Sequence, residues 1–175
     1  LRQSIDRAAE TMIARGVPTL GIHYRGGDKV REGAQPGLAA YFAAIEAVLQ
    51  DDLPDANLFL ATDSEAATRA FYARFPGRVR YLDHERTTGT AGVHYVSRTP
   101  LQAAAEVITD AYLLSRCQHF VGNPHSGIQY WVRFLIPRQQ PAKLKYTPVY
   151  PSGGDRLIYW ASRIRRRLSR GVGGA

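Results

Sequence analysis

The amino-acid sequence predicts an α/β fold built on a doubly wound parallel sheet. Short runs rich in β-branched and aromatic residues alternate with longer stretches in which apolar residues recur at helical spacing. The connections are short, and strand–helix–strand order with short connections favours parallel strands covered by helices on both faces. A length of 175 residues and a hydrophobic fraction of 45% are typical of one globular domain with a substantial core.

Strands are expected where apolar runs are bounded by turn residues. In chain order these runs lie at 17–23, 58–61, 79–82 and 119–122, with an edge strand near 144–149. Gly26-Gly27 ends the first, and Asn123-Pro124 ends the fourth. Residues 83–98 show no period, and a loop of this length inside an α/β unit is usually functional or mobile.

Helices are expected where apolar side chains fall on one face of a 3.6-residue repeat. In chain order these segments are 38–49, 66–75, 100–115, 126–135 and 155–170. Thr62 or Asp63 is the predicted cap of the second helix. Thr99-Pro100 supplies the cap and the first residue of the third, because proline fits the first helical turn.

The net charge of +8 is concentrated at one end of the chain. Residues 156–175 hold six arginines and no acid, which leaves 17 bases and 15 acids in 1–155. A nearly neutral body argues against nucleic acid as a partner. The single cysteine, Cys117, excludes an internal disulfide and fits a reducing cytoplasm, and no apolar run approaches the roughly 20 residues of a membrane span. Because the chain begins with Leu1, we expect further residues upstream.

In such a sheet, ligands bind outside the carboxyl ends of the strands. His23 and Arg25 lie two residues apart at the first strand's end, so both side chains emerge on one face. A guanidinium donates forked hydrogen bonds to phosphate, and Gly26 and Gly27 let a phosphate approach the backbone. This stretch fits an anion site; a tight turn with a surface arginine is the alternative.

Three further positions follow the same logic. The turn at 123–127 precedes a helix, so its free N–H groups and the Ser126 hydroxyl fit an anion, although an ordinary helix cap is the alternative. Asp110 interrupts an apolar helix and, if buried, needs an arginine or ligand donors such as the N1–H and N2–H₂ of guanine. Asp63 fits a helix cap better than a ligand contact. The histidines show no metal-ligand spacing, so we expect no metal site.

The order of these segments resembles the α1,6-fucosyltransferases over about 17–135. The matching motifs are His-x-Arg-x-x-Asp-Lys-Val at 23–30, Phe-Leu-Ala-Thr-Asp at 59–63, Ala-Gly-x-His at 91–94, Ile-Thr-Asp-Ala-Tyr-Leu-Leu-Ser at 108–115 and Phe-Val-Gly-x-x-x-Ser at 120–126. The family includes the enzyme that fucosylates the N-glycan core and the rhizobial nodulation fucosyltransferase. The protein O-fucosyltransferases are more distant relatives.

The resemblance implies a GT-B glycosyltransferase, in which two Rossmann-like domains face a cleft. Residues 1–155 would be the GDP-fucose-binding half, and a missing N-terminal domain would supply most contacts to a glycan or glycoconjugate acceptor. Such enzymes invert the anomeric centre and need no divalent metal, so no cofactor is expected beside the GDP-fucose donor. Another nucleotide sugar is an alternative donor.

Carried over by position, the resemblance implies roles for single residues. His23 and Asp110 would hold guanine, and Arg25 would bind the diphosphate and assist its departure. The predicted donor-binding set is His23, Arg25, Gly26, Asp28, Asp63, Asp110, His125 and Ser126. Glu32 is the predicted catalytic base, with Asp28 as the alternative.

The sequence departs from the family at three places. Gly26 stands where the family has a second arginine, Gly33 where it has the glutamate base, and Asn123-Pro124-His125-Ser126 where it has Thr-Phe-Ser-Ser. Gly33 favours a competing hypothesis, a non-catalytic module that keeps the nucleotide pocket. The basic amphipathic tail 156–175 is expected to pack on the missing domain. Contact with an anionic membrane is the alternative, and would place the protein at the inner face of the membrane.

Overall fold

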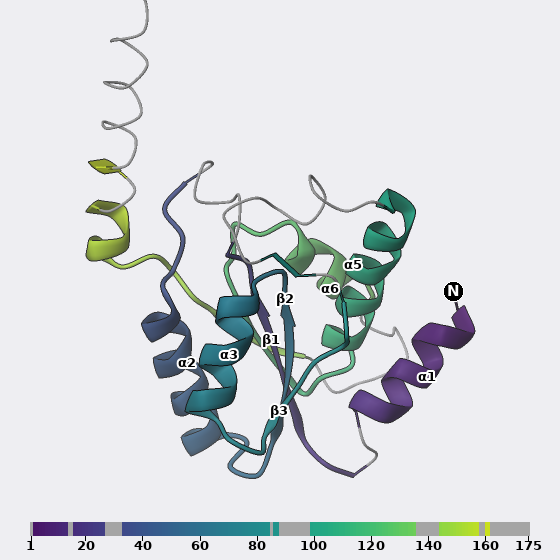
Figure 1. The fold of residues 1–175 in the computed structure, drawn as a ribbon. Helices are drawn as coiled ribbons and strands as arrows, with labels where there is room; N and C mark the ends of the chain where they lie inside the picture. The colour runs from purple at the N-terminus through teal and green to yellow at the C-terminus, as the bar shows by residue number, and fades with distance from the viewer. Residues whose placement is uncertain are drawn as a thin grey trace, which may run out of the picture.

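The computed structural model describes residues 2–13, 16–26, 33–84, 86–87, 99–135, 144–157 and 160–161 (Figure 1). Its elements are α1 (Arg2–Met12), β1 (Thr19–Tyr24), α2 (Leu38–Asp51), β2 (Asn57–Thr62), α3 (Glu65–Arg74), β3 (Val79–Arg80), α5 (Pro100–Leu114), β4 (His119–Gly122), α6 (Ile128–Leu135) and β5 (Lys145–Pro148). The strands form one sheet in the order β3-β2-β1-β4-β5, and every neighbouring pair is parallel. The predicted doubly wound parallel sheet is confirmed.

Helices cover both faces of the sheet. Figure 1 shows α2 and α3 on one side, and α1, α5 and α6 on the other. Because successive strand residues point to opposite faces, each strand contributes to two cores. Leu58 and Leu60 of β2 pack in the core beneath α2 and α3, whereas Phe59 and Ala61 pack against α5.

Helix α1 is an element that the sequence reading did not predict. Its residues Ala8, Ala9 and Met12 pack with Ile13 against the core that contains Leu114 of α5. Met12 follows Ala8 by four residues and Ala9 by three, which is the helical spacing that identified the other helices. The helix covers the end of α5 and lies away from the carboxyl ends of the strands (Figure 1).

The predicted cap of α3 was wrong. Ser64 is the cap, and its Oγ accepts a hydrogen bond from the Ala67 N–H at 3.2 Å. Thr62 instead accepts from the Ser64 N–H through its Oγ1, at 3.2 Å. Asp63 does not cap the helix because its carboxylate is engaged with the backbone that follows β1.

The order of the strands creates a switch point between β1 and β4. The chain passes from β1 through α2 to β2 on one side, and later places β4 on the other side of β1. The connections therefore leave the carboxyl ends of β1 and β4 in opposite directions. Diverging connections of this kind open a crevice, and open α/β sheets bind ligands in such a crevice. Most of the predicted loop 83–98 and most of the tail 156–175 lie outside the described residues.

The start of the tail is anchored near this end of the sheet. The backbone N–H and the hydroxyl of Ser152 both donate to Oδ2 of Asp155, at 2.7 and 2.8 Å. Gly37, which precedes α2, lies against the other oxygen of the same carboxylate. In the part of the chain that the structure describes, no helix is both long and apolar enough to cross a bilayer.

Close packing at Gly21 yields a test of the fold. A Cβ at this position would lie 3.0 Å from both Cys117 Sγ and Leu114 Cδ2. We expect Gly21→Ala to lower the free energy of unfolding by about 1–3 kcal/mol, because the core has no room for the methyl group. Gly153→Ala is the control, since no atom lies within 4 Å of its Cβ position. Equal urea midpoints for the two variants would contradict the packing.

Candidate functional site

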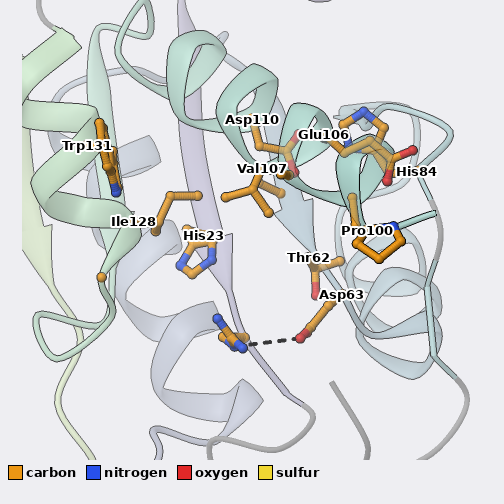
Figure 2. Close-up of a pocket in the computed structure, with 15 residues that line it drawn as sticks. His23, Thr62, Asp63, His84, Pro100, Glu106, Val107, Asp110, Ile128 and Trp131 are labelled. Carbon is orange, nitrogen blue, oxygen red and sulfur yellow. Dashed lines mark ion pairs between the residues drawn. The ribbon is translucent and has the colours of Figure 1, made fainter. Parts of the chain in front are cut away.

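A cavity of about 430 Å³ opens at the carboxyl ends of β1 and β2, between the sheet and helices α5 and α6. Its polar side chains come from separate elements: His23 from β1, Asp110 from α5, and Asp63 and His84 from the segments after β2 and β3 (Figure 2). Arg25 completes this polar wall. The cavity lies at the carboxyl ends of the strands, the side on which ligands bind in open α/β sheets.

His23 is the most deeply buried of these side chains, with 8% of its surface exposed. Its backbone carbonyl accepts a hydrogen bond from the buried Tyr41 hydroxyl at 3.0 Å, which fixes the end of β1. Burial, together with the neighbouring charge of Arg25, lowers the pKa of His23 to about 3. Its Nδ1 has no hydrogen-bond partner among the residues that the structure describes. At neutral pH this ring is therefore uncharged, with one nitrogen able to donate and the other able to accept.

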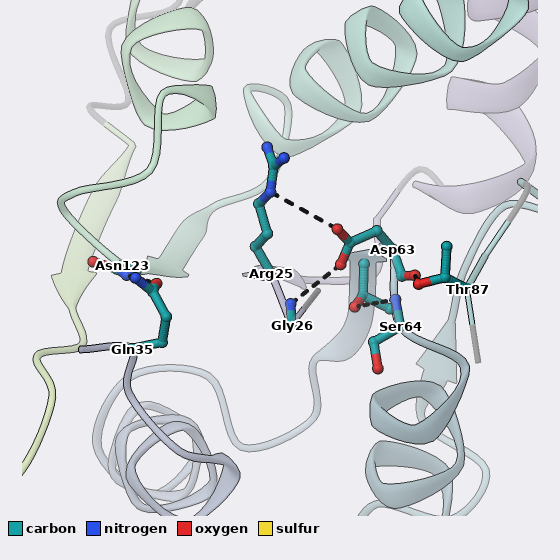
Figure 3. A network of polar contacts seen from close by, with 8 residues as sticks. Arg25, Gly26, Gln35, Asp63, Ser64, Thr87 and Asn123 are labelled. Carbon is teal, nitrogen blue, oxygen red and sulfur yellow. Dashed lines mark hydrogen bonds and ion pairs between the residues drawn. The ribbon is translucent and has the colours of Figure 1, made fainter. Parts of the chain in front are cut away.

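Asp63 holds the turn that follows β1 (Figure 3). Its Oδ1 accepts a hydrogen bond from the Gly26 N–H at 3.1 Å, and its Oδ2 lies 3.8 Å from Nε of Arg25. The contact with Asp63 is made by Nε and not by a terminal nitrogen of the guanidinium. One carboxylate thus positions both the backbone and the positive charge at this end of the cavity.

Gly26 is closely packed in this arrangement. A Cβ at position 26 would lie 3.1 Å from Cβ of Ser64, the residue that caps α3. A side chain at this position would require the start of α3 to shift. The glycine is therefore explained by contact between the turn and the helix, whether or not a ligand binds.

Asp110 is paired, as expected of a buried carboxylate, but its partner within the described residues is a histidine and not an arginine. Its Oδ1 lies 3.4 Å from Nδ1 of His84, and both side chains are more than four-fifths buried. Burial raises the pKa of Asp110, while the contact with His84 and the charge of Arg86 oppose that shift. The pair thus keeps an acceptor group on the cavity wall.

The turn between β4 and α6 is held by Asn123. Its Oδ1 accepts from the His125 N–H at 2.9 Å, and its Nδ2 donates to Oε1 of Gln35 at 2.8 Å (Figure 3). Ser126 is buried and His125 is exposed, and neither lines the cavity. Gly127, the next residue, does line it.

The structure therefore brings together part of the predicted set. His23, Arg25, Asp63 and Asp110 line one cavity, and Gly26 adjoins it through its backbone. Asp28 and Glu32 lie outside the described residues. Within those residues, no three His, Cys, Asp or Glu side chains are close enough together to hold a metal ion.

Several cavity residues were missed by the sequence reading. His84 was considered only as a metal ligand, and its partner on another element gives no local signal. Glu106 lies one helical turn before Asp110, and a search for acids on the same helix face would have found it. Ile128 and Trp131 of α6 supply an apolar wall (Figure 2).

No protein-family model and no curated protein matches the chain. Among solved structures, fucosyltransferase NodZ from Bradyrhizobium matches with a TM-score of 0.57 and 24% identity, over 78% of this chain and 42% of NodZ. A NodZ structure with GDP gives the same TM-score. POFUT1 with GDP-fucose matches with a TM-score of 0.57 and 13% identity, over 84% of this chain and 46% of POFUT1.

The chain shares the Rossmann-like fold of these structures. Arabidopsis thaliana FUT1 with GDP also matches, with a TM-score of 0.50 and 12% identity, over 88% of this chain and 33% of FUT1. The chain spans less than half the length of each of these proteins. At such identities the likeness establishes the fold, and the chemistry has to be argued from the cavity.

The buried histidine predicts how stability depends on pH. Because the pKa of His23 is about 3 in the folded chain and about 6.5 when unfolded, the unfolded chain binds more protons between these values. The contribution of His23 to the free energy of unfolding should therefore be complete above pH 6.5. Below that pH it should decrease by up to about 1.4 kcal/mol per pH unit. Denaturant unfolding at pH 7.5, 6 and 5 measures this slope.

His23→Gln removes the titrating group and should flatten the slope by that amount. His119, whose pKa burial lowers, and Asp110, whose pKa burial raises, contribute to both proteins alike, so the difference between the two slopes reports on His23. Identical slopes in the wild-type protein and His23→Gln would show that His23 is not held neutral.

Proposed function

We propose that the chain is the donor-binding part of a fucosyltransferase-type glycosyltransferase. It would transfer fucose from GDP-fucose to a hydroxyl of a glycan or glycoconjugate, with inversion and without a divalent metal. The observation that carries the proposal is the gathering of His23, Arg25, Asp63 and Asp110 on one cavity at the carboxyl ends of β1 and β2. The support from fold is the likeness to NodZ and POFUT1, whose structures contain GDP or GDP-fucose.

The nucleobase would lie between β1 and α5. The Asp110 carboxylate can accept hydrogen bonds from the N1–H and N2–H₂ of guanine, which together form a donor edge. His23 is neutral at physiological pH, so it can contact the nucleoside without adding charge. A cytosine lacks an N–H at the equivalent ring nitrogen, and uracil has only one donor, so this wall favours guanine.

The diphosphate would lie toward Arg25. Its guanidinium can bind two phosphate oxygens at once, and its contact with Asp63 limits the orientations it can adopt. As the bond from fucose to the β-phosphate breaks, negative charge grows on the leaving GDP, and a preorganised cation stabilises that charge. Arg25 is therefore the residue to which the proposal assigns leaving-group stabilisation, and the turn containing Ser126 is proposed to contribute further donors.

Acceptor activation rests on residues outside the described part of the chain. The proposal assigns the base to Glu32, with Asp28 as the alternative. Metal independence follows from the arginine's role and is proposed on the resemblance to fucosyltransferases. The tail 156–175 is proposed to contact a neighbouring domain or an anionic membrane; Leu157 and Trp160, at its start, are 72% and 59% exposed.

A non-catalytic nucleotide-sugar-binding module is the second candidate. The packing of Gly26 against Ser64 favours it, because a second arginine at position 26 would not fit without movement of α3. Among the described residues, no atom lies within 4 Å of the Cβ position of Gly33, so none of them would crowd a glutamate there. The two candidates share the donor pocket and differ in the chemistry that follows binding.

Donor recognition is tested by isothermal titration with GDP and UDP. We expect GDP to bind at least 10-fold more tightly than UDP, since only guanine offers paired donors to Asp110. Arg25→Ala should weaken GDP binding by about 10- to 100-fold, the loss expected for charge-assisted hydrogen bonds. Arg69→Ala is the matched control, because Arg69 is exposed and pairs with Glu65 on α3. Equal affinities for GDP and UDP, with no effect of Arg25→Ala, would refute the donor assignment.

Catalysis is tested by the release of GDP from GDP-fucose by the natural full-length protein, with and without EDTA. An enzyme should release GDP equally in both conditions and lose at least 10-fold in rate in Glu32→Gln. A binding module should bind GDP-fucose tightly and generate no GDP from it. Inhibition by EDTA would contradict metal independence while leaving donor binding intact.

A further inference from the structure

The segment after β3 crosses the carboxyl edge of the sheet and touches both ends of the proposed donor site. We call its described residues, 82–84 and 86–87, the strap. One side of the strap meets Asp110 on α5, and the other meets Asp63 after β2 (Figures 2 and 3).

Arg86 fixes the backbone of the strap. Its Nη1 donates to the His84 carbonyl at 3.0 Å, and its Nη2 donates to the Leu82 carbonyl. Its guanidinium stacks over the Tyr81 ring, 4.4 Å from the centroid. The His84 N–H also donates to the Leu82 carbonyl, at 2.9 Å. These contacts close the chain into a tight turn and set the direction in which the His84 side chain points.

His84 occupies one oxygen of the Asp110 carboxylate. Its Nδ1 faces Oδ1 at 3.4 Å, and both side chains line the cavity. A carboxylate has about four acceptor positions on two oxygens, so this contact leaves acceptor capacity for a ligand. Glu106 on α5 and Arg86 are the other charged groups that act on Asp110, and of these only Arg86 favours its ionised form, as His84 does.

Thr87 connects the other end of the strap to Asp63. Its N–H donates to the Asp63 carbonyl at 2.9 Å, and its own carbonyl accepts from the Glu65 N–H at 3.2 Å. The strap thereby pairs with the first residues of α3 as a parallel bridge at Ser64. The carboxylate of this same Asp63 holds Gly26 and Arg25.

We propose that the strap positions the two ends of a bound nucleoside diphosphate, with His84 orienting the Asp110 carboxylate toward the nucleobase. His84 is a positioning residue in this proposal, because it acts through Asp110. Thr87 serves the diphosphate end by fixing the backbone of Asp63. The inference rests on the proposed function, since it assumes that the cavity binds the base at Asp110 and the phosphates at Arg25.

The test separates the base from the phosphates. Isothermal titration with GDP and with inorganic pyrophosphate is carried out on the wild-type chain, His84→Ala, His84→Asn, Asp110→Asn and the His84→Ala/Asp110→Asn double variant. We expect His84→Ala to weaken GDP binding by about 10-fold and to leave pyrophosphate binding within twofold, because only the base contacts Asp110. His84→Asn should restore most of the affinity, since its amide replaces the Nδ1–H donor.

The double variant should bind GDP no more weakly than Asp110→Asn alone, because residues that act through one contact are not additive. Thermal unfolding checks that each variant is folded, and His84→Leu, which also lacks the donor, replaces His84→Ala if that variant does not fold. Equal GDP binding by the wild-type chain and His84→Ala overturns the strap proposal alone. The strap proposal is also overturned if the double variant loses GDP affinity by the sum of the two single losses. Equal losses of GDP and pyrophosphate affinity in His84→Ala overturn it as well. If the wild-type chain does not prefer GDP to UDP, the proposed function fails and the strap proposal fails with it.

Discussion

The geometry of the cavity depends on the Asp63 carboxylate. One oxygen accepts the Gly26 N–H and the other faces Nε of Arg25, so a single side chain connects the carboxyl ends of two neighbouring strands. A surface ion pair alone contributes little to stability. Here the charged contact is combined with a backbone hydrogen bond, which limits where the turn after β1 can go. The arginine is consequently held at the cavity before any ligand arrives, which reduces the entropy that binding would cost.

Charge in this cavity is unevenly divided. His23 is neutral because burial opposes its protonation, Arg25 is cationic, and Asp110 is held beside His84. A uniformly positive cavity would attract any phosphate, whereas a cation at one end and acceptors at the other can discriminate between bases. The arrangement suits a ligand that combines an anionic end with a hydrogen-bond-donating ring.

The sequence predicted the sheet well because period-two and period-3.6 patterns are local. It also predicted that His23 and Arg25 share a side of the sheet, since that follows from their spacing. It did not predict Ser64 as the cap of α3, because Thr62, Asp63 and Ser64 are all competent caps. The carboxylate of Asp63 is instead engaged by Gly26, which lies in the turn after β1 and is distant in sequence. The partner of Asp110 was missed for the same reason: a contact between two elements leaves no pattern in either.

The contact between Gly26 and Ser64 limits how this turn can be redesigned. Since a Cβ at 26 would lie 3.1 Å from Cβ of Ser64, a side chain introduced at 26 needs the start of α3 to move by a few tenths of an ångström. A substitution at 26 is therefore coupled to the position of the helix start, because the crowding is relieved only where the cap of α3 can move away.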